Sequence, residues 1–137
     1  LVHHYPSEIT VGEEVAKILN QNPDNVYKTL VTIASDKKNY EFVVPVNCNL
    51  DLKKAAKVVK VKSIEMIKQK DLLPLTGYIH GGCSPIGMKK QFQTVLDQSA
   101  LNHTSILFSA GKKGYSVELA PQALATVLPL KVADITF

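Results

Sequence analysis

Two neighbouring segments rich in β-branched and aromatic residues, 26–34 and 40–46, constrain the fold more than any other feature of the chain. The segment between them, 35–39, reads Ser-Asp-Lys-Lys-Asn and is polar throughout. Strand-forming runs on both sides of a short polar segment are typical of a β-hairpin. The sequence therefore predicts two adjacent strands early in the chain.

Further helices and strands follow from local patterns. Thr10 and Glu13 have the spacing of a capping box, which predicts a helix over about residues 12–20. Helical spacing of apolar residues predicts a helix over 51–57 and another that opens at 63–67 and stops near residue 72, and Pro121 marks the start of a further helix. Additional strands are predicted at 94–96, 105–109, 115–119 and 132–137.

These elements are spread over 137 residues without an internal repeat or a linker. A chain of this length fits one core, so we expect a single domain over residues 1–137. Helices and strands that are mixed along the chain favour an α/β fold, and we expect its sheet to be curved or closed.

Composition and cysteine content limit the classes of protein to which the chain can belong. Hydrophobic residues make up 45% and charged residues 20%, as in ordinary globular proteins, and no apolar run approaches the roughly 20 residues of a membrane span. The first residues lack the pattern of a signal peptide, so we expect a cytoplasmic protein without a membrane partner. Two cysteines, Cys48 and Cys83, are too few for a disulfide framework and are expected to be reduced.

The chain carries a net charge of +4, and all of its cationic side chains other than histidine are lysines. Lysine neutralises a phosphate as a point charge but cannot form the bidentate contact with which arginine recognises guanine. We therefore do not expect sequence-specific DNA binding, whereas contact with an RNA backbone remains open.

Residues 77–90 contain four of the seven glycines and end in two lysines. Closely spaced glycines expose backbone N–H groups, so Gly81 and Gly82 could donate to a developing oxyanion. Removing one such donor typically costs about 2.7–4 kcal/mol of activation free energy. A tight turn without a catalytic role is the alternative, but the length of the pattern Gly-Gly-x-Ser-Pro-x-Gly favours a functional site.

Lys28 is the candidate cation for such a site. Two-residue alternation places it on the same strand face as Val26, Leu30 and Thr32. From the pattern alone, we favour an edge lysine that reaches to water and discourages aggregation. The alternative is a lysine at the mouth of a pocket, where it would hold a phosphate or donate to a substrate.

Other reactive side chains have simpler interpretations. Cys83 could be a nucleophile with His80 as its base, or both residues could bind a metal. The other histidines have no organised spacing relative to this pair. A small buried thiol is the commoner role for such a cysteine. We therefore predict no metal site. Asp97 is a candidate base, although a capping carboxylate is commoner at the end of a strand.

Lysine pairs beside glycine-rich turns are candidates for contacts with a polyanion backbone, because N–H groups and positive charge occur together there. These pairs are Lys89 with Lys90 and Lys112 with Lys113. A further series of lysines could extend the same track, although runs of charge are usually only solvated surface: Lys53, Lys54, Lys57, Lys60 and Lys62.

Several motifs, in order along the chain, resemble the bacterial aminoacyl-tRNA deacylases of the YbaK/EbsC type, which are related to the editing domain inserted in many prolyl-tRNA synthetases. The resemblance covers nearly the whole chain. It rests on Asn22-Pro23-Asp24, Val26-Tyr27-Lys28-Thr29-Leu30, Pro45-Val46, Leu52-Lys53-Lys54, Thr76-Gly77-Tyr78-Ile79, Gly81-Gly82-Cys83-Ser84-Pro85-Ile86-Gly87, Thr94-Val95-Leu96-Asp97, Ser109-Ala110-Gly111-Lys112-Lys113-Gly114 and Glu118-Leu119.

The resemblance implies a strongly curved, barrel-like mixed β-sheet surrounded by helices. It also implies hydrolysis, without a metal or another cofactor, of the ester between a mischarged amino acid, chiefly cysteine, and the acceptor end of proline tRNA. By the same resemblance Lys28 would position the adenosine end and Gly81 would donate to the ester carbonyl, and the substrate's own thiol and ribose hydroxyl would assist cleavage. The implied substrate-binding residues are Tyr78, Gly82, Ser84, Pro85 and Ser109.

Three positions depart from the family pattern. Cys83 replaces an apolar residue, Ser116 replaces a common acidic residue, and Val11 replaces a frequent aromatic residue. The last two departures motivate a second hypothesis, a binding module of the same fold that has lost hydrolysis. Alanine is an alternative to cysteine as the amino acid removed, because a small pocket separates such side chains by only about 1–3 kcal/mol. A module of this kind contacts little of the tRNA body, so prolyl-tRNA synthetase is a candidate partner.

Overall fold

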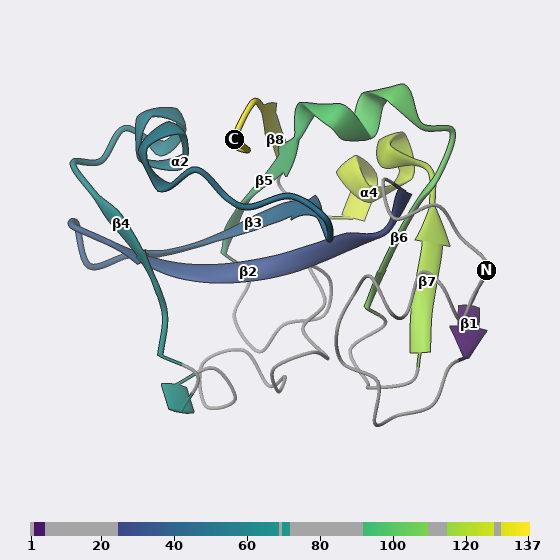
Figure 1. Cartoon of the computed structure of the whole chain (residues 1–137), viewed down its shortest axis with the longest axis horizontal. Coiled ribbons are helices and arrows are strands. Elements are labelled where there is room, and N and C mark those ends of the chain that lie inside the picture. The colour runs from purple at the N-terminus through teal and green to yellow at the C-terminus, as the bar shows by residue number, and fades with distance from the viewer. Residues whose placement is uncertain (1, 5–24, 69, 72–91, 110–114, 128–129) are drawn as a thin grey trace.

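The computed structural model describes residues 2–4, 25–68, 70–71, 92–109, 115–127 and 130–137, and its strands form two sheets (Figure 1). The five-stranded sheet has the order β4 (Ile64–Met66), β2 (Tyr27–Ala34), β3 (Asn39–Pro45), β5 (Gln93–Asp97) and β8 (Leu130–Ala133). The three-stranded sheet has the order β1 (Val2–His4), β7 (Tyr115–Leu119) and β6 (Ile106–Ser109).

The predicted hairpin is confirmed as the antiparallel pair β2 and β3. Its register runs from Tyr27 opposite Pro45 to Ile33 opposite Asn39. The turn is closed by two backbone hydrogen bonds, from Ala34 N–H to the Lys38 carbonyl and from Lys37 N–H to the Ala34 carbonyl, and Lys37 adopts a positive φ of 66° there. On its other side β3 pairs with β5 in parallel, as β5 does with β8, so the sheet is mixed and the predicted α/β class is confirmed.

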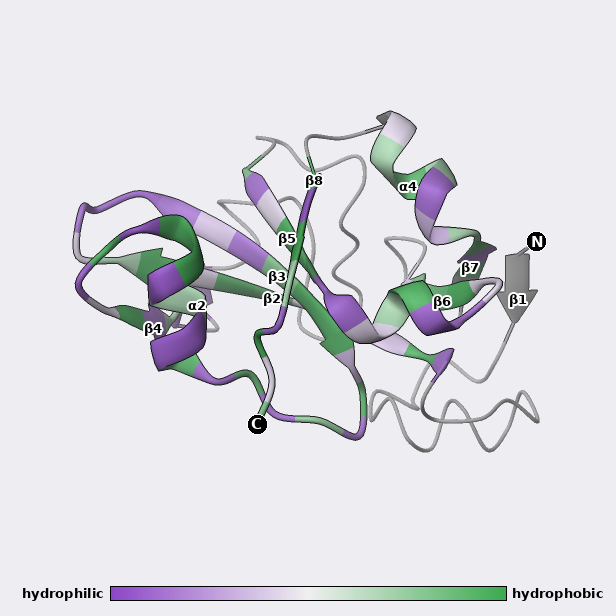
Figure 2. Ribbon diagram, turned by 90° about the horizontal axis from the view of Figure 1, so that it is seen from above, coloured by the Kyte–Doolittle hydropathy of each residue, from purple (hydrophilic) through white to green (hydrophobic). Residues whose placement is uncertain are grey.

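The predicted helix after the hairpin is α2 (Leu52–Val59). The Asp51 carboxylate accepts hydrogen bonds from the backbone N–H groups of Lys53 and Lys54, and thereby satisfies two of the donors that a helix start leaves without partners. The helix ends at Lys60, which adopts the left-handed conformation typical of a C-terminal cap. Figure 2 shows hydrophilic and hydrophobic residues alternating around α2, which packs its apolar side on the sheet.

The prediction of a helix opening at 63–67 is wrong, because residues 64–66 form the edge strand β4. This strand pairs with β2, from Thr32 opposite Met66 to Ala34 opposite Ile64. Ile64 is buried whereas Glu65 and Met66 are exposed, so pairing with an existing strand outweighs the weak helical pattern of a short segment.

The predicted strands at 94–96, 105–109 and 115–119 are confirmed as β5, β6 and β7, and the helix that starts at Pro121 is confirmed as α4 (Pro121–Val127). The last strand was expected at 132–137, but β8 covers Leu130–Ala133. Beyond it the chain turns toward the start of α2, where Asp51 N–H donates to the carbonyl of Ile135.

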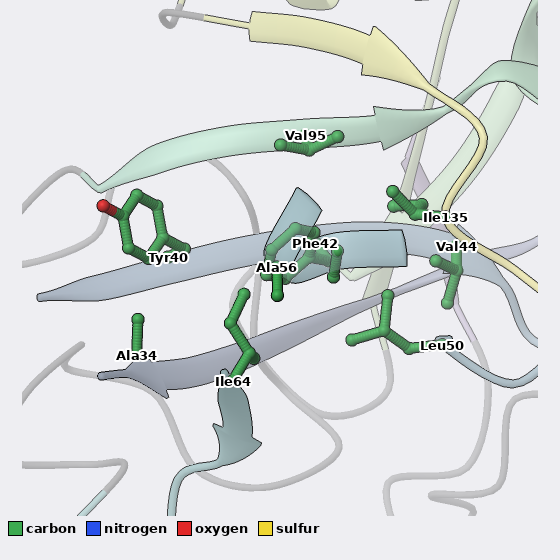
Figure 3. Close-up of a cluster of buried hydrophobic side chains, with 10 residues drawn as sticks. Ala34, Tyr40, Phe42, Val44, Leu50, Ala56, Ile64, Val95 and Ile135 are labelled. Atoms are coloured by element: carbon green, nitrogen blue, oxygen red, sulfur yellow. The ribbon is translucent and has the colours of Figure 1, made fainter. Parts of the chain in front are cut away.

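Among the described residues, alternation along β3 separates two clusters of the core. The α2 cluster lies between the sheet and α2, and Figure 3 shows Val44, Leu50 and Ile135 together at one end of it. The α4 cluster lies on the opposite face of β3 and includes Val43, Leu96, Ile106, Phe108 and Leu124. The central strand is therefore covered on both faces, which explains why β3 is an almost continuous apolar run.

The barrel-like curvature implied by the family resemblance is not confirmed, since the described strands form two open sheets and no closed one. β4 and β8 are the outer strands of the larger sheet. The predicted helix at 12–20 and the glycine-rich segment 77–90 lie outside the described residues. Within the part of the chain that is described, no helix has the length and apolar character needed to cross a membrane.

Candidate functional site

The two sheets meet where β2 begins. Val26, immediately before β2, forms a parallel bridge with Leu107 of β6. Both side chains are buried, and Val46 packs against them to form a small third cluster, the junction cluster. Because the bridge is parallel, β2 and β6 leave it in the same direction.

Lys28 lies two residues beyond this bridge, directly opposite Val44 of β3. Alternation places it on the face of β2 that also carries Val26 and Leu30. Val26 belongs to the junction cluster, whereas Leu30 and Val44 belong to the α2 cluster. Lys28 therefore occupies a half-buried position between two apolar clusters. The pairing of β2 with β4 runs from Thr32 to Ala34 and does not include Lys28, so the pairing does not decide between an edge lysine and a lysine at a pocket.

Ser109 is the last residue of β6 and lies two residues beyond Leu107. It is half-buried and is the register partner of Ser116 in β7. The bridge thus brings two of the predicted site residues, Lys28 and Ser109, to equivalent positions at the junction of the sheets.

The remaining predicted site residues lie outside the described residues. For substrate binding and catalysis they are Tyr78, Gly81, Gly82, Ser84 and Pro85, and for contacts with the tRNA backbone they are Lys89, Lys90, Lys112 and Lys113. His80 and Cys83, the candidate nucleophilic pair, lie in the same segment.

Asp97 has a structural role in this fold. Its carboxylate accepts hydrogen bonds from the backbone N–H of Ser99, which starts the short helix η2 (Gln98–Asn102), and from the backbone N–H of Ile135. The side chain is almost fully buried. The interpretation as a capping carboxylate is confirmed, and the interpretation as a catalytic base finds no support in these contacts.

A pair of polar residues that the sequence analysis did not single out lies in the middle of the larger sheet. Glu41 of β3 and Thr94 of β5 are fully buried register partners, and the Thr94 hydroxyl donates to the Glu41 carboxylate. A single acidic residue inside the apolar run 40–46 was the available signal, because a buried carboxylate requires donors.

Thr29, next to Lys28, has a buried hydroxyl oxygen that has no hydrogen-bond partner among the described residues. A buried hydroxyl without a partner typically costs about 1–3 kcal/mol, so such groups are rare outside functional sites. Alternation places this hydroxyl on the face of β2 opposite to Lys28, on the side of the α4 cluster, so it does not belong to the site at Lys28.

A cavity lined by described residues lies elsewhere, at the far end of β2. It has a volume of about 610 Å³ and is lined by Ile33, Asn39, Glu65, Met66, Ile67, Lys68, Lys70 and Asp71. Ile33 is five residues from Lys28, or roughly 17 Å along an extended strand. We therefore do not assign this cavity to the site at Lys28.

Displaced pKa values also occur at the far end of β2. A hydrogen bond from the backbone N–H of Lys38 lowers the pKa of Asp36, and the Tyr40 hydroxyl also donates to this carboxylate. Burial raises the pKa of Tyr40, and the hydrogen bond to Asp36 raises it further. Within the described residues, no group of three His, Cys, Asp or Glu side chains could hold a metal ion.

Comparison with known proteins identifies the family. Residues 6–127 match the family described as "Aminoacyl-tRNA editing domain". The chain belongs to this family. A protein of Enterococcus faecalis (strain ATCC 700802 / V583), named as a candidate Cys-tRNA(Pro)/Cys-tRNA(Cys) deacylase, EbsC, is 47% identical over 125 residues, which are 91% of this chain and 76% of that protein.

Two solved structures share the fold. A crystal structure described as that of a candidate trans-editing enzyme for prolyl-tRNA synthetase has a TM-score of 0.90 at 24% identity, over 99% of this chain and 85% of that one. A crystal structure of a hypothetical protein has a TM-score of 0.89 at 21% identity, over 100% and 89% of the two chains. At these identities the structural similarity supports the fold alone, whereas the sequence matches show the family to which the chain belongs.

Proposed function

We propose that this protein is a trans-editing deacylase that hydrolyses mischarged tRNA, with Cys-tRNA(Pro) as its main substrate and residues 1–137 as one editing domain. Family membership and the 47% identity to EbsC support the reaction class. The structural observation that carries the site is Lys28, half-buried between two apolar clusters where the two sheets meet. A half-buried lysine packs its aliphatic stem against apolar side chains and can present its ammonium group to a polar ligand.

In this proposal the chain binds and orients the acceptor end and supplies donors to the ester. Lys28 holds the phosphate or ribose of the terminal adenosine, and Gly81 N–H donates to the ester carbonyl as negative charge develops on its oxygen. Ser109, at the equivalent position of β6, contacts the same end of the substrate. Tyr78, Gly82, Ser84 and Pro85 form the rest of the pocket.

The bond that breaks joins the aminoacyl carbonyl carbon to the ribose oxygen. In hydrolysis a water oxygen becomes part of the released carboxyl group, and the ribose oxygen takes up a proton. The substrate's thiol and ribose hydroxyl assist this cleavage, so the proposal needs no nucleophile of the protein and no metal. The proposal also places the protein in the cytoplasm, where aminoacyl-tRNA is used.

A panel of aminoacyl-tRNAs tests the function directly. Purified protein is incubated in EDTA with Cys-tRNA(Pro), Ala-tRNA(Pro) and correctly charged Pro-tRNA(Pro), with and without prolyl-tRNA synthetase, and the remaining ester is measured over time. We expect rapid loss of the cysteinyl ester and a stable prolyl ester. Faster loss of the alanyl ester would reassign the substrate, and a requirement for the synthetase would establish it as a partner.

Binding without hydrolysis is the second candidate. Ser116, the register partner of Ser109, stands where relatives commonly carry an acidic residue, and this departure motivates the binding module. Equal lifetimes of every ester with and without the protein, together with salt-sensitive tRNA binding, would support the binding module and contradict the deacylase.

A further inference from the structure

The outer side of α2 and the loop after it carry four exposed lysines. They are Lys53, Lys57, Lys60 and Lys62, which we call the α2 lysines. Spacings of four and three residues place the first three along one side of the helix and its end. Residues 52–62 contain no Asp or Glu, so the helix itself supplies no negative charge to the α2 lysines.

Two nearby lysines, Lys54 and Lys131, differ from the α2 lysines because their ammonium groups form hydrogen bonds within the protein. Lys54 Nζ donates to the Asp134 carboxylate at 2.9 Å and to the carbonyl of Thr136 at 2.8 Å. Lys131 Nζ donates to the carbonyl of Val58 at 3.1 Å, near the end of α2. These contacts fasten the C-terminal segment to the helix.

By contrast, none of the α2 lysines forms an ion pair with a carboxylate of the described residues. Like charges four residues apart destabilise a helix by about 0.2–0.5 kcal/mol per pair. Helix surfaces that serve only solubility commonly mix both signs of charge. The exposed and unpaired cations therefore suit a partner that supplies negative charge.

We propose that the α2 lysines bind the phosphate backbone of the tRNA acceptor stem, an inference that rests on the proposed function. The start of α2 adjoins the site, because Leu50, just before the helix, packs in the same cluster as Val44, the register partner of Lys28 (Figure 3). An acceptor end held at Lys28 has its stem leading away from the site, and the α2 lysines offer it a cationic surface about 10 Å long from Lys53 to Lys60.

RNA fits this surface better than a protein does. Protein interfaces usually depend on a few exposed aromatic or aliphatic anchors at their centre. The large exposed apolar side chains of the described residues are Ile33, Met66, Leu101, Val132 and Phe137, and none of them belongs to residues 52–62. Contacts with phosphate need only positive charge within reach.

The test compares two variants that each remove two exposed positive charges. K57Q/K60Q removes charge from the proposed surface. The matched control, K68Q/K70Q, removes it from the chain that leaves β4; Figure 1 shows residues 70–71 below the larger sheet and α2 above it. Binding of labelled, uncharged tRNA(Pro) is measured over a range of salt concentrations, and deacylation of Cys-tRNA(Pro) is measured at saturating tRNA. Thermal unfolding verifies that both variants are folded.

We expect K57Q/K60Q to weaken tRNA binding roughly tenfold and to reduce the slope of log affinity against log salt by about 1–2, since each lost phosphate contact lowers it by nearly one. The control should bind like the parent protein, and kcat should be unchanged in both. Equal weakening by both variants, or no weakening by K57Q/K60Q, would overturn the proposal. Intact tRNA binding with lost binding to prolyl-tRNA synthetase would overturn it in favour of a protein interface.

Failure of the proposed function is distinguishable from failure of this inference. If the parent protein deacylates none of the tRNAs, the deacylase proposal fails, whereas the binding of uncharged tRNA still reports whether the α2 lysines contact RNA.

Discussion

The two ends of β2 differ in how their polar side chains are bonded within the fold. At the hairpin end, the Thr32 hydroxyl donates to the carbonyl of Tyr40, Asn39 donates to the carbonyl of Thr32, and the Tyr40 hydroxyl donates to Asp36. At the other end, Lys28 is half-buried between apolar clusters, and the buried hydroxyl of Thr29 has no hydrogen-bond partner among the described residues.

This difference separates the residues that stabilise the protein from the residues that we propose bind its substrate. A polar network that is complete within the fold fixes the hairpin and leaves little for a ligand to add. At the start of β2, in contrast, the Thr29 hydroxyl has no partner among the described residues, and the half-buried Lys28 side chain lies where a ligand could reach it. Substitutions at the hairpin end and in the α2 cluster should therefore change stability, and substitutions at Lys28 should change activity.

The largest effect on stability is expected in the α2 cluster, from Phe42→Ala. Phe42 is fully buried between the sheet and α2, so its loss should reduce the free energy of unfolding by about 3–5 kcal/mol. Urea denaturation measures this change. Phe42→Leu, which retains most of the volume, is the control. Deacylation per folded molecule should remain, and a loss of activity in fully folded Phe42→Ala would break the separation between the two regions.

The buried polar pair in the centre of the sheet should give the next largest effect. Thr94→Val removes the hydroxyl that donates to the buried Glu41 carboxylate, and we expect a loss of about 1–3 kcal/mol in the free energy of unfolding. Thr94→Ser retains the hydroxyl and should recover most of this loss. Equal stability of Thr94→Val and the parent protein would show that the hydrogen bond contributes nothing.

A smaller effect is expected at the start of α2. Asp51→Ala removes the acceptor of the Lys53 and Lys54 N–H groups, which should lower the free energy of unfolding by about 1 kcal/mol. Asp51→Ser retains a capping oxygen and should lose much less. A similar loss for both variants would indicate that the negative charge at Asp51, rather than the hydrogen bond, stabilises the helix.

The smallest effect depends on pH. The pKa of Asp36 is lowered in the folded protein, so its interactions stabilise the fold above the unfolded-state pKa of about 3.8 and are lost as the pH falls through the lower folded-state pKa. Tyr40→Phe removes one of these interactions. The difference in urea midpoint between this variant and the parent protein should therefore shrink as the pH is lowered from neutral to well below 3.8.

Alkaline conditions provide the complementary measurement. The pKa of Tyr40 is raised, so this contribution is fully present below the unfolded-state value of 10.0 and is lost as the pH rises through the folded-state pKa. A constant difference in midpoint over the whole pH range would contradict the coupling between Tyr40 and Asp36.

Local sequence determined much of the fold. The hairpin at 26–46, the helix predicted over 51–57 and the helix that starts at Pro121 each depend on residues close in sequence, and these predictions are confirmed. Residues 64–66 could not be assigned from local pattern, because their strand depends on pairing with β2. The same holds for the bridge between Val26 and Leu107, which joins residues about 80 positions apart.

The candidate site was predicted less completely for the same reason. Alternation placed Lys28 on the correct strand face, but the clusters on either side of it come from β3, β6 and α2, so the pattern alone favoured an exposed edge. Glu41 and Thr94 became a pair only through the parallel register of β3 and β5. Contacts of this kind depend on topology that a single strand does not encode.

Deacylation of Cys-tRNA(Pro) by Lys28→Met tests the central claim most directly, because methionine retains an apolar side chain of similar length and removes only the charge and its donors. The account predicts a loss of roughly 10²-fold in kcat/KM, because the acceptor end is no longer held in the reactive geometry, with the urea midpoint of the parent protein retained. Unchanged deacylation by a folded Lys28→Met protein would contradict the role of Lys28 and the location of the site.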